Sequence, residues 1–261
     1  MKVIVTIKQV PDTHEVRLDP RTGTLIREGV PSIINPEDKN ALEAALSLRE
    51  QLGGEVVVIS MGPPQADDAL REALAMGADR AILLTDRAFA GADTWATATT
   101  LGIAIERIGD YDLILAGRQA IDGDTAQVGP QLAEYLNIPQ ITYVREYEIA
   151  DGKVRAQRAL EDGYELLEAP LPALLTVTKD TNKPRYPTAP GIFRAYREQT
   201  VEHWGAAEVG ADPERVGLKG SPTQVKRSFS PPPKEPGEVI QEPPAEAARQ
   251  LVSRMRQKNL L

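Results

Sequence analysis

Short apolar runs recur along the first two thirds of the chain and alternate with segments whose apolar residues have helical spacing. The runs predict strands at residues 2–8, 56–60, 80–84, 113–116 and 173–178. The segments between them predict helices at residues 35–53, 65–76, 93–108 and 124–136. Strands that are apolar throughout, separated by amphipathic helices, indicate a parallel sheet covered on both faces. We therefore predict an α/β fold with a Rossmann-like, doubly wound, mostly parallel sheet.

Alternating polar and apolar residues predict a second kind of strand in two places. Residues 141–149, 153–159 and 163–168 read as antiparallel strands, with turns at Asp151-Gly152 and Asp162-Gly163. Near the N-terminus, residues 15–27 read as a hairpin that turns at Pro20–Gly23.

The character of the chain changes after about residue 180, because eleven of its 21 prolines lie in the last 81 residues. Periodic spacing returns only at residues 246–260, which predict a terminal helix. Such a segment cannot build a core of its own. We predict a nucleotide-binding α/β domain over residues 1–180 and, over 181–261, an extended arm that packs on something else. Isolated aromatic residues favour docking over the alternative, a disordered tail.

The loop from Gly117 to Pro130 is the most informative stretch, because ligands of open parallel sheets bind beyond the carboxyl ends of the strands. A helix beginning near Asp124 would turn the amides of residues 125–127 outward, and such an end favours a phosphate or pyrophosphate. Gly123 would allow close approach of a ligand. Asp122 and Asp124 suit ribose hydroxyls or capping. The structural alternative is a well-capped helix that follows a tight turn.

Other motifs have simple structural interpretations. Asn35 is a good N-cap and Pro36 suits the first helical position, while residues 89–94 read as a loop with an N-cap. Neither G-x-G-x-x-G after the first strand nor G-x-x-x-x-G-K-[ST] occurs. A plain dinucleotide dehydrogenase or a P-loop phosphotransferase is therefore not expected.

The composition excludes several kinds of partner and cofactor site. The net charge of −8, without a basic tract, argues against a nucleic-acid partner. The absence of cysteine excludes disulfides and iron–sulfur ligation in this chain, and two histidines are too few for a His-rich metal site. Any redox work therefore needs an organic cofactor. No apolar run is long enough to span a membrane, and the N-terminus does not resemble a signal peptide, so we expect a cytoplasmic location.

Several motifs, in order along nearly the whole chain, resemble the β-subunit family of electron-transfer flavoproteins. They are Val10-Pro11-Asp12, Asn35-Pro36-Glu37-Asp38, Ser60-Met61-Gly62-Pro63, residues 75–80, the loop 117–129, Leu171-Pro172-Ala173 and residues 182–186. The resemblance implies a heterodimer in which an α subunit carries the electron-transferring FAD. The β subunit forms a nucleotide-binding domain and an arm that wraps around α.

The resemblance also implies the residues of the nucleotide site. Carried over to this chain they are Thr6, Asn35, Pro36, Glu37, Asp38, Met61, Gly117, Arg118, Gln119, Ala120, Ile121, Asp122, Gly123, Asp124, Thr125, Ala126, Gln127 and Val128. In the housekeeping branch this site holds AMP, and in the electron-bifurcating branch it holds a second FAD near which NADH delivers a hydride. The loops at 122–130 and 89–94 look like the bifurcating type. We therefore favour FAD, with AMP as the alternative.

A recognition loop is implied at residues 182–196, by which β anchors an acyl-CoA-dehydrogenase-like partner. Its docking residues would be Tyr186, Ala189, Ile192 and Phe193. Ala189 stands where the family usually has a leucine, which puts the strength or identity of the partner in question. The structural alternative is a mere link between domain and arm.

Two functions of other classes stay open. One is a nucleotide-binding regulatory or stress module without a redox role. The other is an adenylating enzyme of related fold, for which the sequence supplies no nucleophile or base. Neither alternative needs the long C-terminal arm, and this favours the redox carrier.

Overall fold

The computed structural model describes residues 1–12, 31–227, 229, 237 and 239–261. It divides into two compact units, Met1–Val225 and Lys226–Leu261. The hairpin predicted at residues 15–27 lies outside the described residues. No helix formed by the described residues is long and apolar enough to cross a membrane.

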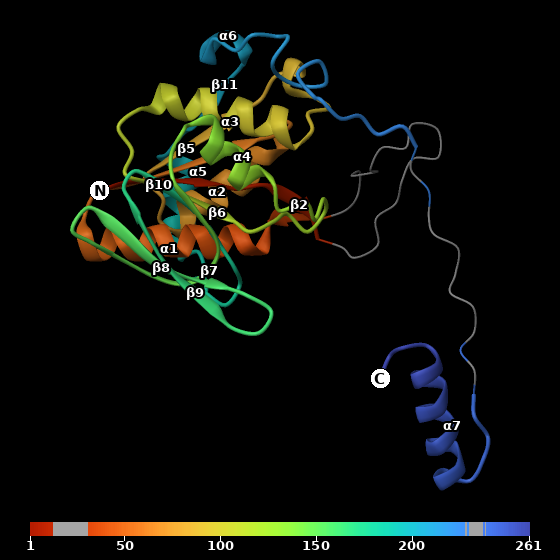
Figure 1. The fold of residues 1–261 in the computed structure, drawn as a ribbon. Coiled ribbons are helices and arrows are strands. Elements are labelled where there is room, and N and C mark those ends of the chain that lie inside the picture. Colours follow the sequence, from red (N-terminus) through yellow and green to blue (C-terminus); the bar gives the residue numbers. More distant parts are fainter. Residues whose placement is uncertain (13–30, 228, 230–236, 238) are drawn as a thin grey trace. The chain divides into compact units, whose positions relative to one another are not determined.

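The first unit is built on one large sheet (Figure 1). Its strands are β1 (Lys2–Thr6), β4 (Glu55–Met61), β5 (Arg80–Leu84), β6 (Leu113–Gly117), β7 (Gln140–Ala150), β8 (Lys153–Ala159), β9 (Tyr164–Pro170), β10 (Ala173–Val177) and β11 (Val201–Trp204). Within the described residues the order is β11-β5-β4-β1-β6-β10-β7-β8-β9. The pairs from β11 to β7 are parallel, whereas β8 and β9 add an antiparallel edge. The predicted mostly parallel α/β fold is therefore confirmed.

Helices cover both faces of this sheet (Figure 1). They are α1 (Pro36–Leu52), η1 (Pro64–Ala66), α2 (Asp67–Met76), η2 (Arg87–Phe89), α3 (Thr94–Ile108), α4 (Val128–Tyr135), α5 (Ala189–Arg197) and α6 (Ala206–Val209). A short antiparallel pair, β2 (Gln9–Pro11) with β3 (Ser32–Ile34), precedes α1. The second unit contains α7 (Pro244–Gln257), close to the helix predicted at residues 246–260.

Alternate residues of each central strand enter two separate apolar layers. In β1, Val3 and Val5 belong to the layer under α1, α2 and α5, while Ile4 belongs to the layer under α3, α4 and α6. On α1, Leu42 and Leu46 lie one turn apart and are both fully buried. Burying a side chain of this size contributes about 1.5–3 kcal/mol. The period-2 strands and amphipathic helices of the sequence thus account for a core on both faces.

The order of the strands creates a topological switch point. From β1 the chain proceeds through β4 to β5 on one side, and it then returns to β6 on the other side of β1. Thr6 pairs with Ile59 of β4 and with Ala116 of β6, so the carboxyl ends of these three strands lie side by side. In doubly wound folds this is where ligands bind.

Helix α4 begins at Val128, so the prediction of a helix from Asp124 was wrong. Asp124 and Ala126 have φ values of 54° and 53°, which are left-handed and cannot continue an α-helix. Gln127 occupies the N-cap position without a side-chain capping hydrogen bond. Sequence propensity did not reveal the left-handed residues, because neither is a glycine.

The compact unit also extends further than the predicted boundary near residue 180. Strand β11 pairs in parallel with β5, with Val201 opposite Ala81, and so completes an edge of the main sheet. On α5, Ala195 is fully buried in the layer that also contains residues of α2. These elements bury their apolar residues against the core of the preceding domain, so a segment without a core of its own still joins the compact unit.

Candidate functional site

Three strands end at the switch point with residues that the sequence had singled out. Thr6, Met61 and Gly117 are the last residues of β1, β4 and β6. A Cβ atom on Gly117 would lie 2.3 Å from Oδ1 of Asp38 and 2.8 Å from its backbone nitrogen. Only glycine lets β6 approach the first turn of α1 this closely.

Asn35 stands immediately before α1, but its side chain does not cap the helix as predicted. It is fully buried, and its Nδ2 donates to the carbonyl of Gln119 at 2.9 Å. Its Oδ1 accepts from the backbone nitrogen of Ile121 at 3.0 Å. Pro36 occupies the first turn of α1, as expected. The side chain of Asn35 therefore fixes the loop that follows β6, while only its backbone carbonyl takes part in the first turn of α1.

Asp38 joins the ends of two strands. Its carboxylate accepts from the backbone nitrogen of Lys8 at 2.8 Å and from that of Gly117 at 3.1 Å. Burial raises the pKa of Asp38 to about 7, although hydrogen bonds from Asn35, Lys8 and Gly117 favour the charged form. Removal from water thus outweighs the hydrogen bonds at this position.

Glu37 and Arg118 form a second contact between α1 and the loop. The Oε2 atom of Glu37 accepts from the backbone nitrogen of Gln119 at 3.2 Å and lies 3.4 Å from Nε of Arg118. Burial raises the pKa of Glu37 in spite of Arg118. The guanidinium lies over the ring of Tyr143, 5.7 Å from its centroid. Within the described residues, the buried Nε of Arg118 has no hydrogen-bond partner.

The acidic residues of the loop are already paired within the protein. Asp122 accepts from Nζ of Lys8 at 2.6 and 2.8 Å, and Asp124 accepts from the side-chain amide of Gln119. Lys8 was not among the predicted site residues, although it directly follows β1. The Lys8 ammonium neutralises the charge of Asp122, whereas the neutral amide of Gln119 only fixes the direction of Asp124.

The next three backbone nitrogens remain free. In the part of the chain that the structure describes, the amides of Thr125, Ala126 and Gln127 donate to no protein acceptor. Ala126 has positive φ and Gln127 is right-handed, an alternation that directs successive N–H groups to one side and suits an anion. A Cβ on Gly123 would meet no described atom within 4 Å, so the protein itself does not demand glycine there.

The predicted nucleotide-site residues therefore gather at one edge of the sheet. Ala120 forms the turn of the loop by accepting from the nitrogens of Gly123 and Asp124, and Val128 starts α4. Lys8 and Tyr143 belong to the same edge and were missed. Tyr143 has positive φ and follows the start of β7, where a bulge interrupts the pairing with β10. Sequence gave no signal for that bulge.

The predicted docking residues lie elsewhere, on α5 and the segment before it. Tyr186 is 87% exposed and Phe193 59% exposed, and Ala189 and Ile192 are also exposed. Thr188 caps α5 by accepting from the nitrogen of Gly191 at 3.1 Å. The predicted loop is thus partly a short, capped helix.

Fold and site together define a doubly wound α/β protein of the Rossmann-like class, with a polar edge at its switch point. Comparison with known proteins identifies the family. The "Electron transfer flavoprotein domain" family matches residues 22–208. The electron transfer flavoprotein subunit beta of Thermoanaerobacterium thermosaccharolyticum is 58% identical over 261 residues, which cover 100% of both chains.

Two further relatives carry different names. The caffeyl-CoA reductase-Etf complex subunit CarD of Acetobacterium woodii is 56% identical over 263 residues, covering 100% of both chains. Protein FixA of Bradyrhizobium diazoefficiens is 48% identical over 260 residues, covering 97% of this chain and 90% of that one. The chain belongs to the electron transfer flavoprotein family, in its β-subunit group, and its role is electron transfer.

Proposed function

We propose that the chain holds FAD at the carboxyl edge of β1, β4 and β6, as the β subunit of a heterodimeric electron-transfer flavoprotein. The observation that carries the proposal is the run of unpartnered amides at Thr125, Ala126 and Gln127, beside a loop that buried Asn35 and Asp38 hold in place. Free N–H groups on a fixed backbone suit a pyrophosphate. The site residues carried over from the family resemblance all belong to this edge.

The surrounding side chains fit a nucleotide. The buried Nε of Arg118 forms an ion pair with Glu37 at 3.4 Å but no hydrogen bond among the described atoms, and it can therefore supply a further donor. Asp122 is neutralised by Lys8, so it does not oppose a phosphate, and Asp124 is held by the side chain of Gln119. When bound, the flavin supplies the redox chemistry, since the chain contains no cysteine. AMP, the alternative ligand, shares the same phosphate chemistry.

FAD in this subunit would place the protein in the electron-bifurcating branch, with NADH as the hydride donor. The loops at residues 89–94 and 122–130, which look like that type, support this. Thr94 and Gln127 connect the two loops through a side-chain hydrogen bond of 3.1 Å. This hydrogen bond holds the two loops next to each other.

We further propose an α subunit as the permanent partner, contacted by the second unit. Helix α7 has no buried residue, and Leu251 and Val252 on it are 52% and 40% exposed. A helix that buries nothing is stabilised by packing on a partner. The cytoplasmic location expected from the sequence stays a prediction.

For the redox partner we propose an acyl-CoA-dehydrogenase-like enzyme that docks on Tyr186, Ala189, Ile192 and Phe193. Ile192 and Tyr196 line a hollow of about 330 Å³ between α5 and α2. An exposed apolar group beside a hollow suits a small, exchangeable interface. The name of one relative, CarD, couples it with a caffeyl-CoA reductase, which favours a partner that handles CoA thioesters.

The deciding measurement is the flavin and AMP content of the purified heterodimer. We expect two flavins and no AMP, with direct reduction of at least one flavin by NADH. Thr125→Val tests the site, because loss of one hydrogen bond worth about 0.5–1.5 kcal/mol should lower nucleotide affinity up to tenfold. One flavin and one AMP per heterodimer would refute the FAD assignment but would leave the site in place.

A further inference from the structure

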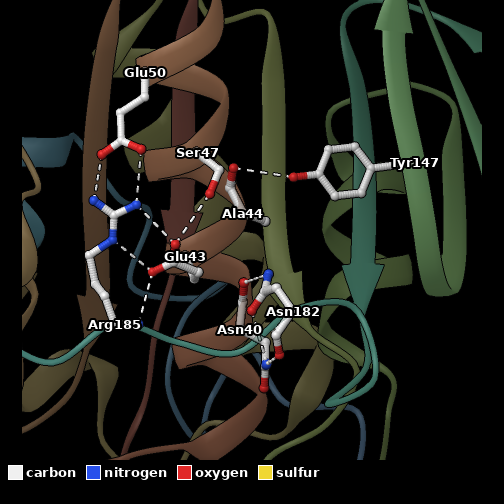
Figure 2. Close-up of polar contacts among 8 residues, drawn as sticks. All are labelled: Asn40, Glu43, Ala44, Ser47, Glu50, Tyr147, Asn182 and Arg185. Atoms are coloured by element: carbon white, nitrogen blue, oxygen red, sulfur yellow. Dashed lines mark hydrogen bonds and ion pairs between the residues drawn. The ribbon is translucent and has the colours of Figure 1, made fainter.

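The segment that leads to the docking residues is fastened to the middle of α1 (Figure 2). The guanidinium of Arg185 donates to both oxygens of Glu43, at 2.8 and 2.9 Å. It also donates to both oxygens of Glu50, at 2.5 and 3.2 Å. The backbone nitrogen of Arg185 adds a further hydrogen bond to Glu43, at 3.0 Å. One arginine thus bridges two carboxylates that lie two turns apart on one helix.

A second contact lies one turn earlier on α1 (Figure 2). Nδ2 of Asn40 donates to the backbone oxygen of Asn182 at 2.8 Å, and Nδ2 of Asn182 donates to the backbone oxygen of Asn40 at 2.9 Å. Asn40 is only 5% exposed. This reciprocal pair fixes the backbone direction three residues before Arg185.

The electrostatics of the Arg185 contact favour the charged pair. Burial would raise the pKa of Glu43, but hydrogen bonds from Arg185 outweigh it and lower that pKa. The same arginine lowers the pKa of Glu50. A planar guanidinium presents its donors in a fixed fork that matches the paired oxygens of two carboxylates, whereas a lysine ammonium is a compact charge without such a fork. The geometry is therefore specific to arginine.

The docking helix that follows is held as well. Nη1 of Arg71 on α2 donates to the carbonyl of Ala195 at 2.8 Å. A Cβ on Gly191 would lie 2.3 Å from the carbonyl oxygen of Ala75, so α5 packs closely on α2. Between the anchor at Arg185 and the contact of Ala195 with α2, the side chains of Tyr186 and Phe193 remain exposed. Their backbone is fixed and their side chains face outward.

We propose that Arg185, through Glu43 and Glu50, is a positioning residue that presets the docking segment 186–193 before a redox partner arrives. The inference rests on the proposed docking function. A preset surface loses less conformational entropy on binding than one that must order. Arg185 itself touches no reacting atom, so its loss should weaken partner binding and leave electron transfer within the bound complex unchanged.

The test uses the full heterodimer with Arg185→Lys, and Glu50→Gln as a second variant because Glu50 is half-exposed. The control is Arg155→Lys. The exposed side chain of Arg155 on β8 also contacts two carboxylates, those of Glu168 on β9 and Glu148 on β7. Hydrogen–deuterium exchange of residues 183–193 measures how firmly the segment is held when no redox partner is present. Steady-state electron transfer to an acyl-CoA dehydrogenase gives KM and kcat separately.

For Arg185→Lys we expect exchange in residues 183–193 to rise about tenfold and KM for the dehydrogenase to rise several-fold, with kcat, flavin content and NADH reduction unchanged. Glu50→Gln should show a smaller change in the same direction, and Arg155→Lys none. Unchanged exchange or unchanged KM in both variants overturns the inference.

Ile192→Asp separates the docking proposal from the positioning proposal. If Ile192→Asp slows electron transfer while the Arg185 variant does not, the docking function stands and the positioning role of Arg185 is refuted. If Ile192→Asp also has no effect, the docking function fails, and the positioning role fails with it.

Discussion

Helix α1 carries two groups of carboxylates whose pKa values shift in opposite directions. In its first turn, burial raises the pKa of Glu37 and brings that of Asp38 to about 7. Further along the helix, the pKa values of Glu43 and Glu50 are lowered. All four side chains accept hydrogen bonds. The mere presence of hydrogen bonds therefore does not explain the difference.

Between Asp38 and the second group, the difference lies in the donors. Glu37 also contacts a guanidinium, that of Arg118 at 3.4 Å, and there burial outweighs the contact. Asp38 receives neutral amide donors, whose dipoles do not recover the cost of removing a carboxylate from water. Glu43 and Glu50 receive a guanidinium, which brings a full opposite charge and a matching fork. The first pair organises the backbone at the switch point, and the second fastens a distant segment. One helix thus serves two sites through two kinds of partner.

The pH dependence of stability should separate the two groups most clearly. Because the folded pKa of Asp38 is raised from 3.8 to about 7, its contribution is present below pH 4 and lost as the pH rises through 7. At about 1.4 kcal/mol per pKa unit, the loss is on the order of a few kcal/mol. Chemical denaturation between pH 4 and 8 should show a flatter profile for Asp38→Asn than for the wild type. Parallel profiles would contradict the burial argument.

Gly117→Val should disrupt the close contact between β6 and the first turn of α1. Its Cβ would overlap Asp38, so the junction must open and the carboxylate must lose partners. We expect a loss of about 3 kcal/mol in unfolding free energy, measured by denaturation, and loss of bound nucleotide. Gly123→Ala is the matched control, because a Cβ there meets no described atom within 4 Å. Equal stability of both variants would show that the junction is not tight.

In the second group, the stability lost on replacing Glu43 or Glu50 should depend on how deeply each side chain is buried. Glu43 is 8% exposed, whereas the side chain of Glu50 is 53% exposed. Glu43→Gln should therefore cost about 1–3 kcal/mol and Glu50→Gln less than about 1 kcal/mol. The lowered pKa values mean that this stability is present above pH 4.5 and lost as the pH falls below it. Unfolding midpoints at pH 7 and pH 3 measure both effects; a larger effect for Glu50 would reverse the assignment.

The smallest effect is expected for Tyr147→Phe. The hydroxyl donates to the carbonyl of Ala44 on α1 at 3.2 Å, as Figure 2 shows, and burial raises the pKa of Tyr147 to about 12. The ring remains packed in the variant, so only one neutral hydrogen bond is lost. We expect about 0.5–1 kcal/mol, measured by thermal unfolding, with no change in nucleotide content. A cost like that of Glu43→Gln would show that the hydroxyl is part of the Arg185 cluster.

The sequence by itself determined the fold class and most elements of the first unit. Strand β5 spans the predicted residues 80–84, and Asp93 caps α3 as predicted, accepting from the nitrogen of Ala96 at 3.0 Å. These are local properties, because apolar period and capping depend on residues a few positions apart. The motif order along the chain was enough to identify the family as well.

Only the tertiary structure decided how distant residues use their polar atoms. Asn35 has the sequence of a helix cap, yet its amide serves residues 119–121, which are far along the chain. The left-handed backbone of Asp124 and Ala126 prevents a helix there, so α4 starts only at Val128. Likewise, β11 joins the sheet because β5 offers an open edge. Such choices depend on partners that folding brings together, and no local pattern encodes them.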